Sequence, residues 1–130
     1  MIVQKHAFGC GVACVAVAAN CSYEEACNVL GSVKAGHTGF TCEELIKALN
    51  EFGLSYQYKY FKPQIKSSAY KNGAIIFLKR TKKYPAGHYL VRHKNKWHDS
   101  WINFPDDRTK AGYRKRLPYA PSYVIFPYNN

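Results

Sequence analysis

The feature that most constrains the fold of this chain is a change of hydrophobic period near residue 54. Before that point apolar residues recur at helical spacing, and after it they alternate with polar residues as in β-strands. The run from Cys10 to Ala19, CGVACVAVAA, is small and apolar on every side, which is typical of a buried helix. A chain that places its helices first and its strands afterwards is predicted to fold as an α+β domain.

Two further helices are predicted by capping boxes, in which a Ser or Thr is followed three residues later by a Glu. The pairs are Ser22 with Glu25 and Thr41 with Glu44. Each predicted helix ends at a glycine, Gly31 for the first and Gly53 for the second.

The second part of the chain predicts an antiparallel sheet. The expected strands are residues 54–61, 74–78, 89–92, 96–101 and 122–126. Residues 93–95 between the third and fourth strands indicate a hairpin turn, and the basic stretch 104–121 is predicted to be a surface loop. The expected architecture is one domain, residues 1–130, in which N-terminal helices pack on an antiparallel β-sheet.

Charge is distributed unevenly along the chain. The net charge is +11, but residues 1–58 carry 3 basic and 5 acidic side chains, whereas residues 59–130 carry 16 basic and 3 acidic ones. The basic part could attract an acidic partner through long-range steering, or it could be a solvated face that keeps the protein soluble. Tyrosines interleaved with lysines leave open an alternative function, in which the protein binds anionic partners and catalyses nothing. Nucleic acid is the less favoured of these partners.

The five cysteines all lie in the first third of the chain, and their number is odd. This is a poor disulfide framework and contains no CxxC pair, so a zinc site is not expected. A reducing compartment is favoured, the cytoplasm of a bacterial or phage-infected cell, with a secreted protein as the less favoured alternative. The longest apolar run, residues 7–19, is too short for a membrane span.

Cys10 is the first residue to suggest chemistry. It lies between Gly9 and Gly11 at the start of the buried helix, where the helix dipole favours a thiolate. The two glycines are interpreted as allowing a substrate backbone to approach closely. A thiolate nucleophile needs a base, and His88 opens a predicted strand.

Asp99 follows His88 by eleven residues, near the end of the partner strand of the hairpin. Antiparallel strands joined by a tight turn bring their outer ends side by side, so the carboxylate of Asp99 is predicted to orient the imidazole of His88. His98 precedes Asp99, and its side chain is therefore expected on the opposite face of the strand.

The order of Gln4, Cys10-Gly11, His88 and Asp99 resembles the bacteriocin-processing, double-glycine leader peptidases, which are papain-like cysteine peptidases. The resemblance covers roughly residues 2–102 and includes the spacing of six from Gln4 to Cys10. Ser100 stands where that family usually has a proline after the aspartate.

The resemblance implies a papain-like fold and a cysteine peptidase without a metal or organic cofactor. It makes Cys10 the nucleophile, His88 the base, Asp99 the residue that orients it, and Gln4 a donor to the oxyanion together with the N–H of Cys10. The substrate would be a peptide or protein segment. The same order of residues also occurs in acyl transferases such as transglutaminases, which pass the acyl group to an amine, so this alternative stays open.

Overall fold

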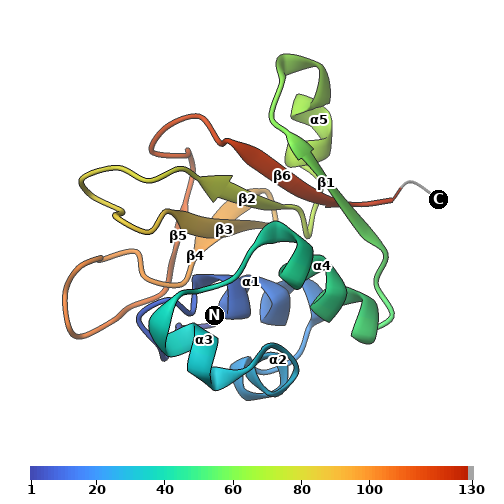
Figure 1. The fold of residues 1–130 in the computed structure, drawn as a ribbon. Helices are drawn as coiled ribbons and strands as arrows, with labels where there is room; N and C mark the ends of the chain where they lie inside the picture. The colour runs from blue at the N-terminus through green and yellow to red at the C-terminus, as the bar shows by residue number, and fades with distance from the viewer. Residues whose placement is uncertain (129–130) are drawn as a thin grey trace.

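The computed structural model describes residues 1–128 and shows an α+β architecture (Figure 1). Its four N-terminal helices are α1 (Cys10–Ala19), α2 (Tyr23–Leu30), α3 (Ser32–His37) and α4 (Cys42–Glu51). The strands are β1 (Tyr56–Tyr60), β2 (Ile75–Leu78), β3 (His88–His93), β4 (Lys96–Asp99), β5 (Gly112–Arg114) and β6 (Tyr123–Pro127). A short helical segment, η1 (Pro63–Ile65) followed by α5 (Lys66–Ala69), joins β1 to β2.

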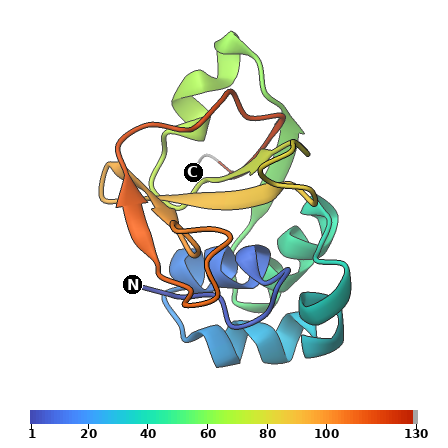
Figure 2. The ribbon, with the colours of Figure 1, turned by 90° about the vertical axis from the view of Figure 1, so that its left-hand side faces the viewer.

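The strands form one antiparallel sheet in the order β1-β6-β2-β3-β4-β5. Helices α1 to α4 cover one face of this sheet, and α5 lies on the other, as the turned view makes clear (Figure 2). Because side chains alternate along each strand, the sheet separates two apolar cores. Ile75, Val91 and Ile125 face the helices, while Ile76, Leu90 and Val124 face the opposite side.

Both predicted capping boxes are present in the structure. The Ser22 hydroxyl accepts from the N–H of Glu25, and the Thr41 hydroxyl accepts from the N–H of Glu44. In each case the glutamate reaches back to the N–H of the capping residue, so two of the helix's first donors are satisfied. The helices end at Leu30 and Glu51, close to the glycines that predicted their ends.

The buried helix predicted from Cys10 to Ala19 is confirmed as α1. Residues 11–16 are buried, and α1 packs on β3 on one side and on α2 and α4 on others. The expectation that Gly9 and Gly11 admit a substrate backbone is wrong. A Cβ on Gly9 would lie 2.2 Å from the hydroxyl of Tyr23, and one on Gly11 would lie 3.0 Å from a methyl of Leu45. The glycines therefore serve the packing of α1 against neighbouring helices.

The expected strands differ from the observed ones by one or two residues at their ends, and three differences in this half of the chain matter for the fold. The strand expected to reach residue 101 ends at Asp99, because the chain turns away there. The hairpin turn is the two residues Lys94 and Asn95, both with positive φ, which suits the twist of paired strands. The segment predicted as a loop, 104–121, contains β5, which pairs with β4 although its sequence has little strand pattern.

No helix within residues 1–128 is long and apolar enough to cross a membrane.

Candidate active site

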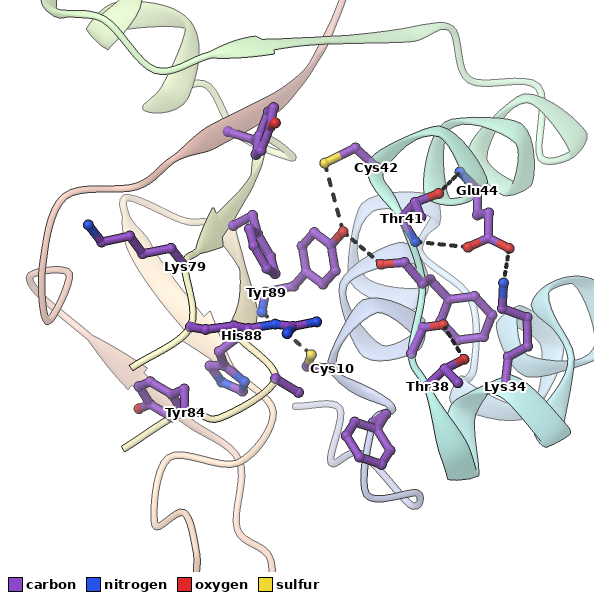
Figure 3. Close-up of a pocket in the computed structure, with 18 of the residues that line it drawn as sticks. Cys10, Lys34, Thr38, Thr41, Cys42, Glu44, Lys79, Tyr84, His88 and Tyr89 are labelled. Carbon is purple, nitrogen blue, oxygen red and sulfur yellow. Dashed lines mark hydrogen bonds and ion pairs between the residues drawn. The ribbon is translucent and has the colours of Figure 1, made fainter. Parts of the chain in front are cut away.

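Cys10 and His88 meet where the first residue of α1 lies against the first residues of β3. The backbone N–H of Tyr89 donates to Cys10 Sγ at 3.5 Å, which ties the thiol to β3 (Figure 3). The Cys10 thiol also lies close enough to the imidazole of His88 to raise the pKa of that ring. Cys10 is half-buried and lines an open cleft, so its sulfur lies at the end of a helix and within reach of a ligand.

Gly87 sets the direction in which His88 enters β3. Its φ is +76°, and a Cβ there would lie 2.3 Å from the ring of Phe77 and 2.8 Å from the carbonyl oxygen of Leu78. Only glycine fits both the backbone angle and the space. The sequence Gly87-His88 therefore fixes the position of the imidazole at the mouth of the strand.

Asp99 orients His88. His88 Nε2 lies 2.7 Å from Asp99 Oδ1, and the two side chains are 5% and 0% exposed. The predicted proximity of these residues is confirmed, because the β3–β4 hairpin brings its outer ends together. With Nε2 bound to the carboxylate, Nδ1 is the ring nitrogen left to accept the proton of the Cys10 thiol.

The charges of this group reinforce one another. Burial by itself lowers the pKa of His88, but hydrogen bonds to Asp99 and Cys10 and their charges raise it to about 9. Burial raises the pKa of Asp99, and the hydrogen bond from His88, with help from Arg114 and the N–H of Trp101, lowers it to about 2. The site thus favours a protonated imidazole beside an ionised carboxylate at neutral pH.

Gln4 is buried beside the site and lines the same cleft. Its carbonyl oxygen accepts from the hydroxyl of Ser100 at 2.7 Å, and its Nε2 donates to the carbonyls of His6 at 3.0 Å and Ala7 at 3.3 Å. Both amide hydrogens therefore have acceptors. Donation to an oxyanion requires the longer contact, to Ala7, to be exchanged for one to the substrate.

The cleft has a volume of about 1080 Å³ and runs between the helical layer and the ends of the central strands β2 and β3 (Figure 3). One wall is formed by the segment that leads into α4, and the other by the chain between β2 and β3. The Tyr89 hydroxyl donates to the carbonyl of Phe40 at 2.9 Å and so joins the two walls at the floor. Cys10 and His88 both line this space, which is large enough for several residues of an extended peptide.

The other cysteines are placed differently from Cys10. Cys14 lies one helical turn further along α1, is 1% exposed, and has a pKa raised by burial. Burial also raises the pKa of Cys42, which lines the cleft and contacts the Tyr89 hydroxyl at 3.8 Å. All five cysteines are free thiols, and the described residues contain no His, Cys, Asp and Glu cluster that could hold a metal ion.

His98 belongs to a different part of the structure. It pairs with Val91 on the helix-facing side of the sheet, and its Nε2 accepts the backbone N–H of Ile2 at 3.0 Å. The rings of His98 and Tyr113 lie edge to face. The side chain is 1% exposed, and burial, followed by the nearby positive N-terminus, lowers its pKa to about 4.

This placement of His98 predicts that stability falls on mild acidification. An unfolded chain binds a proton at His98 near the ordinary pKa of 6.5, whereas the folded chain resists it until about 4. The contribution of His98 to the free energy of unfolding is therefore fully present above pH 6.5. It is lost as the pH falls to about 4, by about 3 kcal/mol in total. Urea unfolding of the parent and of His98→Gln at pH 7 and 4.5 measures this loss.

The His98→Gln variant should lose much less stability than the parent between these pH values, since its amide oxygen can accept from Ile2 but does not titrate. His37→Gln is the matched control, because His37 is exposed, and it should behave like the parent. Equal pH dependence in the parent and His98→Gln would contradict the assignment.

Three neighbours of His88 and Asp99 were missed by sequence reasoning: Tyr84, Ser100 and Arg114. The ring of Tyr84 stacks on the ring of His88, with centroids 4.8 Å apart and an interplanar angle of 4°. Arg114 Nε donates to Asp99 Oδ2 at 2.8 Å. Ser100 could have been selected from the sequence, because it directly follows Asp99. Arg114 could not, because nothing distinguishes it from the other basic residues around it.

A scan against protein-family models found no match for the chain, and a search of curated proteins found no significantly similar relative.

Proposed function

We propose that this protein is a papain-like cysteine peptidase that hydrolyses a peptide bond in a peptide or protein segment. The observation that carries the proposal is the buried His88–Asp99 pair at the cleft that Cys10 also lines, with the Cys10 thiol held against β3 by the N–H of Tyr89. A thiol, a base and a group that orients the base, all at one open cleft, form the arrangement that nucleophilic acyl transfer requires. The order of helices followed by an antiparallel sheet supports the papain-like fold as part of this proposal.

In the proposed reaction, the thiol of Cys10 gives its proton to His88 and the thiolate attacks the carbonyl carbon of the scissile bond. The tetrahedral oxyanion would receive hydrogen bonds from the N–H of Cys10, which has no partner within its helix, and from the amide of Gln4. His88 then protonates the leaving amine, and a thioester on Cys10 remains. Water, deprotonated by His88, releases the carboxylic acid and restores the thiol.

The cleft also suggests how a substrate is recognised. Lys34 is paired with Glu44 on the helical wall, whereas no ion pair holds Lys79 or Arg80 among the described residues. These two cations stand on the opposite wall, where they would favour an acidic side chain on the substrate. An acidic peptide is therefore the partner that we propose for the basic part of the chain.

Selective alkylation tests the function without a known substrate. At pH 6, iodoacetamide should modify Cys10 at least about 10-fold faster than any of the other cysteines, because proton transfer to His88 provides a thiolate. Mass spectrometry of the digested protein gives the rate at each cysteine. His88→Ala should remove this advantage, whereas His37→Ala, at an exposed position on α3, should keep it.

Labelling of Cys10 at the same rate as Cys21, a half-buried thiol outside the cleft, would count against the proposed function. So would an unchanged Cys10 rate in His88→Ala, because the imidazole would then have no part in activating the thiol.

A further inference from the structure

Asp99 is held by more than its contact with His88. Its side chain is fully buried and accepts three hydrogen bonds. Oδ1 accepts from His88 Nε2 at 2.7 Å and from the N–H of Trp101 at 3.0 Å, and Oδ2 accepts from Arg114 Nε at 2.8 Å. A buried carboxylate without a cation beside it is costly, so the guanidinium of Arg114 completes the site around Asp99.

The backbone delivers Arg114 to this position through β5. In the β4–β5 ladder, Gly112 lies opposite Asp99 and Arg114 lies opposite Trp97, so β5 borders the strand that carries the carboxylate. A Cβ on Gly112 would lie 2.8 Å from the side chain of Ile102, which shows how closely β5 approaches the preceding turn. This pairing explains why a residue fifteen positions after Asp99 reaches it.

Arg114 also reaches the second neighbour of the imidazole. Its Nη2 donates at 3.4 Å both to the hydroxyl of Tyr84 and to the carbonyl of Ile102. Tyr84 stacks in parallel on the ring of His88. The guanidinium of Arg114 therefore contacts both neighbours of the His88 ring: the Asp99 carboxylate at the edge of the ring and the Tyr84 phenol on the face of the ring.

We propose that Arg114 is a positioning residue of the active site, which holds Asp99 and Tyr84 around His88 and offsets the charge of the buried carboxylate. The proposal rests on the peptidase function proposed above. Arg114 lies outside the residues that line the cleft, so it acts through its neighbours and does not touch substrate.

The charge of Arg114 has a consequence that can be measured. The groups that face His88 are the Asp99 carboxylate, the Cys10 thiol and the Tyr84 phenol. Arg114 hydrogen-bonds to the carboxylate and to the phenol from the side away from the imidazole. A lone carboxylate would hold the proton on His88 more tightly than a carboxylate already paired with a cation. Removal of the positive charge should therefore raise the pH at which His88 loses its proton.

Arg114→Met and Arg114→Lys separate the two parts of this role, with Arg116→Met as the control. Arg116 is exposed two residues further on, and its substitution removes the same charge from the surface. Turnover of a peptide that the parent cleaves and alkylation of Cys10 by iodoacetamide are both measured from pH 4 to 10. Thermal unfolding establishes the folded fraction of each variant.

Arg114→Met should lower turnover by about 10- to 100-fold, the effect typical of losing a group that orients an active-site residue. The Michaelis constant should be nearly unchanged, and the higher apparent pKa of both profiles should move upward. Arg114→Lys keeps the charge, so it should restore that pKa and part of the turnover. A merely structural role would lower the folded fraction and leave the profile of the folded protein unchanged.

Profiles and turnover of Arg114→Met that equal those of Arg116→Met would overturn the proposal. If the parent cleaves no peptide, the proposed function fails, but the alkylation profile of Cys10 still reports the state of His88. The positioning role then stands or falls on whether Arg114→Met shifts that profile and Arg114→Lys restores it.

Discussion

Cys10→Ala is expected to abolish peptide hydrolysis, with a loss of about 10⁶-fold in turnover, the effect of removing a nucleophile from a triad enzyme. Alanine is small and favours helices, so it fits the first position of α1 without disturbing the packing around it. Circular dichroism and thermal unfolding should match the parent. The measurement is turnover of a peptide that the parent protein cleaves.

Cys14→Ala is the matched control, because Cys14 lies one turn further along the same helix and is buried. It should lose about 1 kcal/mol of stability and keep its activity, since its thiol faces the core and not the cleft. Equal loss of activity in the two variants would contradict the assignment of Cys10 as nucleophile. Retained activity in Cys10→Ala would do the same.

Gln4→Ala should give the second largest effect, a loss of about 10²- to 10³-fold in turnover. The amide would act on charge that develops only in the transition state, so the Michaelis constant should stay nearly constant. The rate of Cys10 alkylation should also persist, because the imidazole that takes up the thiol proton is untouched. Turnover, Michaelis constant and alkylation rate are measured on the same preparation.

Ser100→Ala separates the oxyanion role of Gln4 from its structural role. It removes the hydrogen bond between the Ser100 hydroxyl and the Gln4 carbonyl oxygen but leaves the amide hydrogens in place. It should therefore reduce turnover by less than about 10-fold. If Gln4→Ala is no slower than Ser100→Ala, the spacing of Gln4 and Cys10 carries no catalytic meaning.

Sequence reasoning succeeded where the interactions are local. The capping boxes at Ser22 and Thr41 involve residues three apart, so the chain alone determines where α2 and α4 begin. The meeting of His88 and Asp99 depends on a tight hairpin, whose register follows from a two-residue turn and eleven residues of sequence. Contacts of this kind need no knowledge of the rest of the fold.

It failed where the outcome depends on distant packing. Gly9 and Gly11 were expected to make room for a substrate backbone, but the space beside them is filled by Tyr23 and Leu45. These two side chains approach α1 from other helices. Strand β5 forms because the chain returns to the free edge of β4, and nothing in its own residues, Gly112 to Arg114, shows that return. Arg114 could not be selected among the basic residues around it for the same reason.

The most direct test of the account is a search for new peptide ends in water enriched in ¹⁸O. The protein is incubated with a diverse peptide library that includes acidic sequences, and the products are analysed by mass spectrometry. Hydrolysis of a thioester on Cys10 predicts new carboxyl termini that carry ¹⁸O with the parent protein, and no such termini with Cys10→Ala. Products joined to added amines in place of labelled acids would indicate an acyl transferase, and cleavage that persists in Cys10→Ala would contradict the account.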